Sequence, residues 1–149
     1  MTGAGRERNY LVVTRKSIAR EIDAAATLLQ KLVRLVAADD NGLVQCVTCN
    51  KWAHWKDMQG GHFISRRSTK WKLVEENVHP QCPGCNGFLM NHGNGKQIYT
   101  AWMIDYYGRE FVDHMLATCG ETKKYTRAEV ADIAADFKAR IKTEEARVI

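Results

Sequence analysis

The chain has 149 residues, of which 45% are hydrophobic, and its 22 Lys and Arg residues outnumber its 17 Asp and Glu residues to give a net charge of +5. This length and apolar content suit one folded domain and argue against a disordered chain, while the charge is compatible with nucleic-acid binding without indicating it. No run of about 18 apolar residues and no signal-peptide-like N-terminus occurs, so we expect a cytoplasmic protein with no membrane partner.

The N-terminal part of the chain combines a basic segment with a helix. Residues 1–16 are predicted to form a basic arm that precedes a single domain over residues 17–149. Ser17 can cap a helix, and apolar residues then recur at alternating steps of four and three. These residues are Ile18, Ile22, Ala25, Leu29, Leu32 and Val36. The stripe can pack against the chain's own C-terminal helices or form a dimer interface. We favour the second, and therefore predict a homodimer held by a helix over residues 17–40.

The middle of the chain lacks helical periodicity. Residues 43–46 and 59–65 are predicted to form short strands with a hairpin between them. A helix is expected to begin at Asn86, and the C-terminal helices are expected over residues 97–143. The latter comprise helices over residues 98–107 and 109–116, and a last helix that opens with the capping box Thr126-x-x-Glu129.

Two Cys-x-x-Cys pairs bracket this middle region. They are Cys46 with Cys49 and Cys82 with Cys85. In a reducing compartment this spacing favours a tetrahedral thiolate site for one structural zinc ion over two disulfides. Cys119 stands alone and is predicted to be a small buried hydrophobic residue. The predicted fold class is therefore α+β, mostly α, with a small zinc-bound centre flanked by helices.

Polar residues beside the cysteine pairs supply candidate chemistry. His62, Asn77 and His79 lie between the pairs, and Asn86 follows the second pair at once. A histidine can accept a proton from water near neutral pH, and an asparagine can orient an imidazole or bind a hard metal ion through its amide oxygen. A strand carrying His62, packed on a helix carrying Asn86, would place both in one cleft suited to metal-dependent phosphodiester hydrolysis.

Each of these residues also has a structural alternative. His62 can hydrogen-bond a cysteine thiolate, and Asn77 can be an ordinary turn residue. His79 can be purely structural, and Asn86 can be a helix N-cap without any metal. For His62 we favour catalysis, because two glycines precede it and a basic run follows it.

The basic run after His62 is placed where a phosphodiester would dock. Its members are Arg66, Arg67, Lys70 and Lys72. The alternative is a solvated surface, and we favour phosphate contact. Trp52, Trp55 and Trp71 flank the same region and can stack on unpaired bases, although we expect at least two of them to pack inside the domain.

Several segments together resemble the NinG/Rap family of phage recombination endonucleases, within the HNH or ββα-metal superfamily. The segments are Cys-Val-Thr-Cys at 46–49, Gly-His-Phe-Ile-Ser-Arg at 61–66, Glu-Asn-Val-His-Pro-Gln-Cys-Pro-Gly-Cys-Asn at 76–86 and Gly-Asn at 93–94. A looser similarity extends over residues 17–143. The resemblance implies a structure-specific endonuclease that cleaves branched DNA, including Holliday junctions and D-loops. It also implies that His62 is the general base, Asn77 its orienting partner and Asn86 a ligand of a catalytic Mg²⁺ or Mn²⁺.

One position departs from the superfamily pattern. Many HNH enzymes carry an acidic metal ligand immediately before the histidine, and here that residue is Gly61. The candidates for a second ligand are, in falling order, His79, Asp57, Gln59 and Asn94. We therefore predict a site with His62, Asn77 and His79 as catalytic residues and with Asn86 and Asp57 as metal ligands. The missing acid also supports a zinc-dependent nucleic-acid-binding module without catalysis, and an HNH nickase of duplex DNA is a further alternative.

Overall fold

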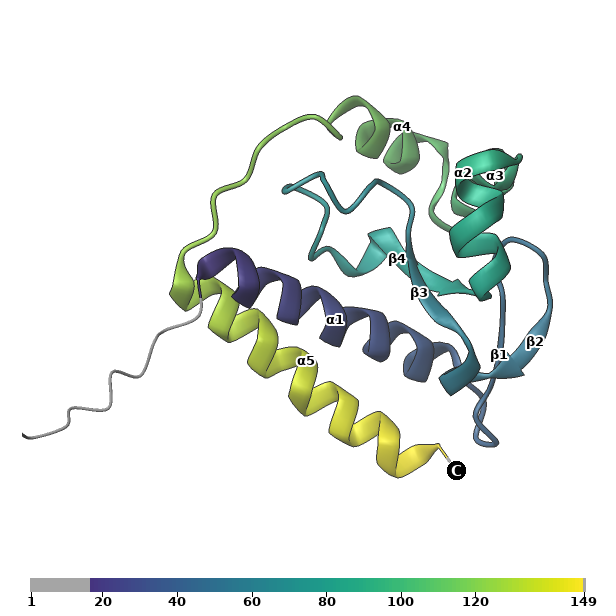
Figure 1. Ribbon diagram of the computed structural model, residues 1–149, viewed down its shortest axis with the longest axis horizontal. Coiled ribbons are helices and arrows are strands. Elements are labelled where there is room, and N and C mark those ends of the chain that lie inside the picture. The colour runs from purple at the N-terminus through teal and green to yellow at the C-terminus, as the bar shows by residue number, and fades with distance from the viewer. Residues whose placement is uncertain (1–16, 149) are drawn as a thin grey trace, which may run out of the picture.

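The computed structural model describes residues 17–148, so the basic arm predicted for residues 1–16 lies outside the described residues. Within them the fold is α+β, as predicted: helices surround two short antiparallel sheets (Figure 1). No helix in the described part of the chain is long and apolar enough to cross a membrane.

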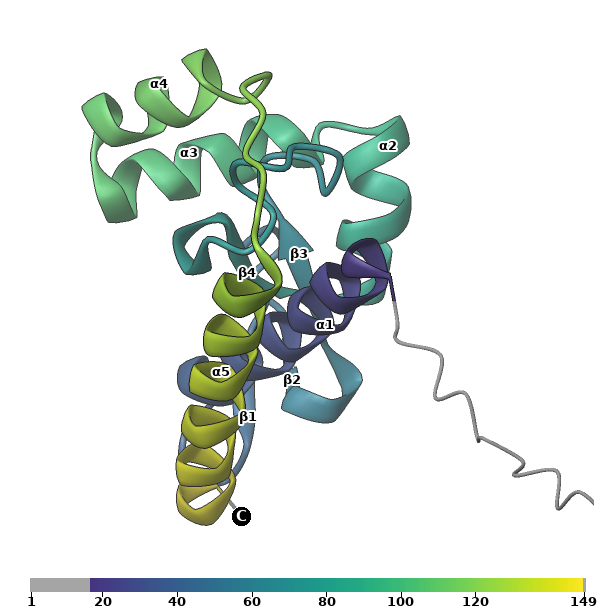
Figure 2. The same ribbon diagram turned by 90° about the vertical axis from the view of Figure 1, so that its left-hand side faces the viewer.

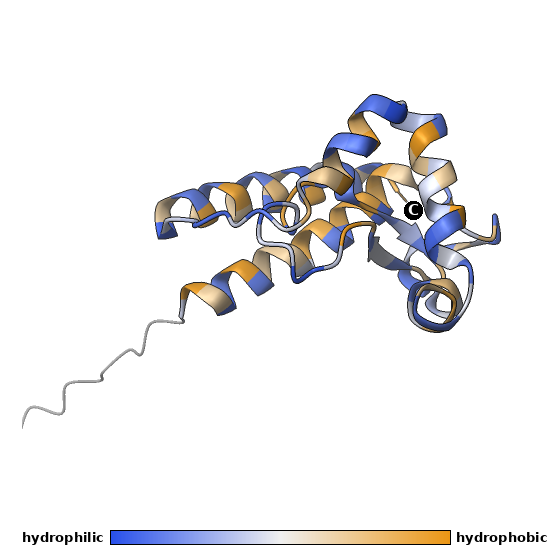
Figure 3. Cartoon of the chain, turned by 90° about the horizontal axis from the view of Figure 1, so that it is seen from above, coloured by the Kyte–Doolittle hydropathy of each residue, from blue (hydrophilic) through white to orange (hydrophobic). Residues whose placement is uncertain are grey.

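The two longest helices lie side by side and form one layer of the molecule (Figures 1 and 2). Helix α1 (Ile18–Ala37) begins at Ser17, whose side chain accepts a hydrogen bond from the backbone N–H of Arg20 at 3.4 Å. Helix α5 (Arg127–Arg147) opens with the predicted capping box between Thr126 and Glu129. Apolar and polar residues alternate around both helices (Figure 3), which is the pattern of helices buried on one side only.

The apolar stripe of α1 packs within the chain. Leu29 and Leu32 are fully buried in a cluster with Phe137 and Ile141 of α5. At the end of the stripe Val36 remains 45% exposed. The buried part of the stripe therefore packs against the C-terminal helix of the same chain. The dimer interface that we favoured cannot use these buried residues.

The strands pair differently from our prediction. Strand β1 (Leu43–Gln45) pairs with β2 (Trp52–His54), and β3 (Gln59–His62) pairs with β4 (Val78–Gln81), so the expected hairpin between residues 43–46 and 59–65 is wrong. The chain reverses early because Asn50 adopts a left-handed conformation with φ of 64° in the turn after β1. Strand β4 is only four residues long and contains Pro80, so its sequence does not mark it as a strand, although all four of its residues are buried.

The helices that follow the second cysteine pair form the other layer. A π-helical turn over Cys85–Leu89 leads into α2 (Met90–His92), then α3 (Gly95–Tyr107) and α4 (Arg109–Ala117). Tyr99 and Met103 of α3 are fully buried in a core that lies on the far side of the β3–β4 sheet from α1. The predicted helices over residues 98–107 and 109–116 are thus confirmed, and the β3–β4 sheet lies between two helical layers.

Candidate functional site

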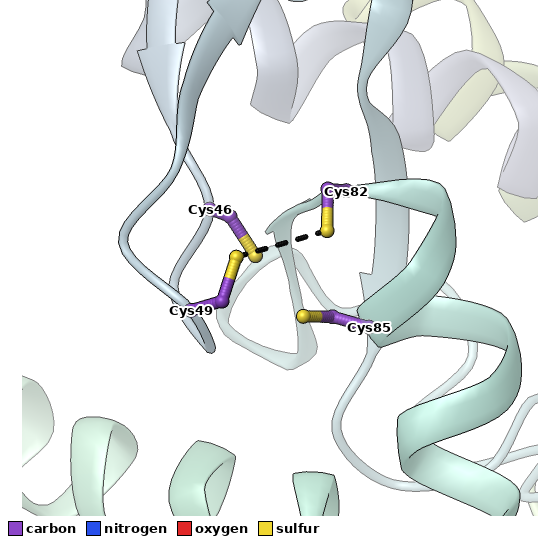
Figure 4. A group of neighbouring side chains, drawn as sticks. All are labelled: Cys46, Cys49, Cys82 and Cys85. Carbon is purple, nitrogen blue, oxygen red and sulfur yellow. Dashed lines mark hydrogen bonds between the residues drawn. The ribbon is translucent and has the colours of Figure 1, made fainter.

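Four cysteine thiols converge where the two sheets meet the π-helical turn (Figure 4). The sulfur atoms of Cys46, Cys49, Cys82 and Cys85 all lie within 4.8 Å of one another, and those of Cys49 and Cys82 are 3.8 Å apart. A tetrahedral zinc ion with Zn–S bonds of about 2.3 Å places its sulfur ligands about 3.8 Å apart, so the four residues can hold one zinc ion. None of the four forms a disulfide, as expected for a metal site. Cys119 is exposed, so its predicted burial is wrong.

The cysteine cluster ties two turns together beside Asn86. Cys46 and Cys49 belong to the turn between β1 and β2, and the backbone N–H of Cys46 donates to Lys51 O at 2.8 Å. Cys82 follows β4, and its carbonyl accepts a hydrogen bond from the N–H of Asn86 at 2.9 Å. A metal ion held by the four thiols would therefore fix the start of the π-helical turn that carries Asn86.

His62 stands at the end of β3 with its ring held in one orientation. Only 8% of the residue is exposed, and its Nε2 lies 3.0 Å from Lys72 O. A carbonyl oxygen can only accept a hydrogen bond, so Nε2 carries the proton and Nδ1 keeps a free lone pair. Burial, helped by the charges of Arg66 and Lys72, lowers the pKa of His62 to about 4. The imidazole is therefore neutral at pH 7 and can accept a proton, and an adjacent phosphate anion would raise its basicity.

Asn77 holds the loop after His62 rather than the imidazole itself. It is fully buried, and its Oδ1 accepts from the N–H of Ile64 at 2.6 Å. Its Nδ2 donates to Ile64 O at 3.0 Å and to Trp71 O at 3.1 Å. The predicted direct contact with His62 is wrong, because the group that orients His62 is the carbonyl of Lys72. Asn77 acts one step further away, by fixing the backbone next to Lys72.

A cleft of about 710 Å³ brings His62 and Asn86 together between α1, β3 and the π-helical turn, as predicted. Asn86 Nδ2 donates to Gln59 Oε1 at 2.8 Å. Gly60 allows α1 to form one wall, because a Cβ at this position would lie 2.6 Å from Gln30 Cα. Close packing of a helix on this strand thus requires glycine here.

The donors in the cleft fit a divalent ion only weakly. Of the four candidates for a second ligand, only Gln59 lines the cleft; Asp57 and Asn94 do not, and no carboxylate occurs among the described residues that line it. No acid can simply replace Gly61, since a Cβ there would lie 1.8 Å from Gln81 Oε1. Mg²⁺ takes few protein ligands but prefers charged oxygens. The cleft offers only the neutral amide oxygens of Asn86 and Gln59 to such an ion, and the prediction of Asp57 as a ligand finds no support in this geometry.

His79 lies on the opposite face of the β3–β4 sheet from His62. It pairs with Gly61 in the sheet, whereas His62 pairs with Val78, and successive residues of a strand face opposite sides. Its Nδ1 is 2.9 Å from the hydroxyl of Tyr99, and its Nε2 is 2.8 Å from that of Tyr107. His79 therefore does not share the cleft of His62, and its predicted place in one catalytic constellation is wrong.

The predicted basic cluster divides into two pairs. Arg66 and Arg67 line the cleft, and neither forms an ion pair within residues 17–148. Lys70 and Lys72 do not line it, because they pair with Glu121 and Asp23 respectively. Two of the four residues predicted to contact DNA therefore line the cleft, and their contact with DNA stays a prediction.

Two cleft cations were missed by sequence reasoning. Arg34 of α1 and Lys96 of α3 line the cleft, yet both lie far from His62 in the chain. Arg34 donates to Met58 O at 2.9 Å and lies 5.6 Å from the ring centroid of Trp55. No local pattern marks either residue, since only the packing of α1 and α3 on β3 brings them to the site.

The tryptophans follow the packing interpretation. Trp71 is only 6% exposed, and Trp55 is partly buried between two core clusters. Trp52 is 58% exposed. Two of the three are therefore part of the domain interior, as expected.

The comparisons with known proteins give one match. The family described as "Bacteriophage Lambda NinG protein" matches residues 5–146, nearly the whole chain. No curated protein and no solved structure matches the chain.

Proposed function

The chain belongs to the NinG family, and from this premise we propose that it is a structure-specific DNA endonuclease that hydrolyses branched recombination intermediates such as Holliday junctions and D-loops. The observation that carries the proposal is the cleft that His62, oriented by Lys72 O, shares with Asn86 and several basic side chains. The order of strand β3, strand β4 and helical turn, with His62 and Asn86 on the first and last, also matches what the HNH resemblance implies.

In the proposed reaction His62 acts as the general base. Its Nδ1 takes a proton from a water molecule while the water oxygen bonds to phosphorus. The bond from phosphorus to the leaving sugar oxygen breaks, and that oxygen takes a proton from solvent. Lys72 O holds the ring throughout, because Nε2 donates to it at 3.0 Å.

A catalytic divalent ion, Mg²⁺ or Mn²⁺, forms part of the proposal. Asn86 would hold it, with Gln59 beside, and the chemistry it supplies is neutralisation of charge on the leaving oxygen. The proposed structural ion is zinc, which the four cysteines would hold.

We propose that the active protein is a homodimer. Two symmetric cuts across a branched substrate require two equivalent active sites, which a two-fold dimer supplies. The contact must use a surface other than the buried part of the α1 stripe, which packs on α5.

A second candidate is a zinc-dependent nucleic-acid-binding module without catalysis. The absence of carboxylates among the described cleft residues favours it. A nickase of duplex DNA would use the same cleft and differ only in how the clefts of two chains face the substrate.

Cleavage of a synthetic four-way junction and of matching linear duplex, in Mg²⁺ or Mn²⁺, separates these candidates. We expect wild-type protein to make paired cuts in the junction, His62→Ala to bind but to cut about 10²–10⁴-fold more slowly, and His114→Gln, an exposed change on α4, to behave as wild type. Cutting of duplex alone would indicate the nickase. Binding without cutting by wild-type protein in either metal would favour the binding module.

A further inference from the structure

Lys96 lines the cleft of His62 from the side of α3. It is the second residue of α3, and its Nζ donates to the carbonyl of Phe63, the residue after His62. The same Nζ lies 4.0 Å from the ring centroid of Phe63, so the cation is held by a carbonyl and an aromatic face.

The position of Lys96 depends on close packing at the start of α3. A Cβ on Gly95 would lie 2.8 Å from the carbonyl carbon of Leu89 and 2.9 Å from its oxygen. Glycine therefore lets α3 begin directly against the π-helical turn that carries Asn86. This contact directs the first turn of α3, with Lys96, toward β3.

Lys96 has no carboxylate partner within residues 17–148, and no described residue of the cleft wall is acidic. Lys96 is partly buried, and this burial lowers its pKa. Lys70 and Lys72, by contrast, are paired with acids outside the cleft. A partly buried cation without a counter-charge is costly, and an anion that enters the cleft relieves the cost.

We propose that Lys96 is a catalytic residue, whose ammonium group binds a non-bridging oxygen of the scissile phosphate; this inference rests on the nuclease function proposed above. Negative charge grows on these oxygens as water attacks, so a fixed cation stabilises the transition state more than the bound substrate. Lys96 keeps its proton and forms no covalent bond. The cleft has no carboxylate among its described residues, so it would bind a divalent metal ion only weakly. Lys96 supplies a positive charge that does not depend on that ion.

The test compares Lys96→Met, which keeps the stem over Phe63, with Lys96→Arg, which keeps the charge. Lys142→Met, on the exposed face of α5, is the matched control. Single-turnover cleavage rates at saturating DNA, dissociation constants and melting temperatures are measured for all four proteins. We expect Lys96→Met to cleave about 10²–10³-fold more slowly while binding DNA less than about tenfold more weakly. Lys96→Arg should recover part of the rate, and the control should match wild type.

The outcomes separate this inference from the function on which it rests. A Lys96→Met protein that cleaves at the wild-type rate, while His62→Ala is inactive, overturns the role of Lys96 alone. Equal losses in rate and binding, or a lowered melting temperature without rescue by arginine, also overturn it in favour of a binding or structural role. Wild-type protein that cleaves no substrate overturns both proposals.

Discussion

At the scale of single residues, a backbone carbonyl orients His62, whereas the sequence motif suggests that a side chain does so. Lys72 O orients His62, and Asn77 fixes the neighbouring carbonyl of Trp71 together with both backbone groups of Ile64. Asn77 therefore stabilises the loop whose Lys72 carbonyl orients His62, without contacting His62 itself.

Asn77→Ala should destabilise the protein. The change leaves the N–H and C=O of Ile64 and the carbonyl of Trp71 without their side-chain partner in a buried site, at a cost of about 3 kcal/mol. Urea unfolding of the zinc-loaded protein measures it, with Asn41→Ala in the exposed turn after α1 as control. A loss below about 1 kcal/mol would contradict the buried network.

His79→Gln should weaken the dependence of stability on pH. Burial lowers the pKa of His79 to about 4, so between pH 6.5 and 4 the unfolded chain binds the proton that the folded chain refuses. Stability is unaffected by this group above pH 6.5 and falls as pH drops through that window. From pH 7 to 5 the loss due to His79 is roughly 2 kcal/mol. Glutamine can hydrogen-bond Tyr99 and Tyr107 but does not titrate, so the free energy of unfolding of the His79→Gln protein should fall less between pH 7 and 5 than that of wild type. Urea unfolding at each pH measures both, and an equal fall in the two proteins would contradict this expectation.

At the scale of elements, the β3–β4 hairpin is wedged between two helical layers. Gly60 faces α1, and Gly61 faces the buried side chain of Gln81, whose Nε2 donates to the hydroxyl of Thr48 at 2.7 Å. The space that an acidic ligand at position 61 would need is therefore occupied. This gives a structural reason for the departure from the HNH pattern.

Gly61→Ala should cost about 1–3 kcal/mol of stability, because its Cβ would lie 1.8 Å from Gln81 Oε1. In a chain that already carries Gln81→Ala, the same change should cost much less. A double-mutant cycle measured by urea unfolding isolates this coupling. An equal cost of Gly61→Ala in both backgrounds would show that Gln81 is not what fills the space.

The elements also show how far sequence reasoning reaches. Helix ends with capping residues, such as Ser17 and the Thr126–Glu129 box, were predictable because their signals are local. The partner of β3 was not, since β4 is only four residues long and contains a proline, which is uncommon inside a strand. The helix that packs on the apolar stripe of α1 was not predictable either, because the spacing of the stripe suits a helix of the same chain and a helix of a second copy equally well.

The candidate site was predictable in part for the same reason. His62, Asn86 and the four cysteines lie in compact motifs, and the structure brings each group together. The placement of His79 depends on which face of a strand it occupies, and that required the register. Arg34 and Lys96 reach the cleft only through tertiary packing.

At the scale of the whole molecule, the cysteine cluster joins the β1–β2 turn to the segment after β4, which also contact each other through hydrogen bonds from the Val47 N–H to Pro80 O and from Gln81 to Thr48. Its core contains Val44 and Met58, and it is distinct from the α1–α5 core of Leu29, Leu32 and Phe137. A zinc ion there would hold the β1–β2 turn and the start of the Asn86 turn together, whereas the helix pair has apolar contacts of its own.

Removal of zinc should therefore act locally before it acts globally. Chelation, or Cys82→Ser, should lower the melting temperature and abolish cleavage, because Asn86 loses its fixed position. Hydrogen exchange should rise over residues 43–58 and 82–92, while the amides of α1 remain protected. Uniform loss of protection along the chain would contradict this division, and a metal-free protein with unchanged exchange would exclude a structural ion.

The central claim is that the reaction occurs in the cleft between α1 and β3. The most direct measurement compares the single-turnover cleavage rate of wild-type protein with those of His62→Ala and His79→Gln, on branched DNA at pH 7. We expect His62→Ala to lose about 10²–10⁴-fold in rate and His79→Gln to stay within about threefold of wild type, because only His62 faces the cleft. Loss of cleavage in His79→Gln with retention in His62→Ala would contradict the account and place the reaction on the opposite face of the sheet.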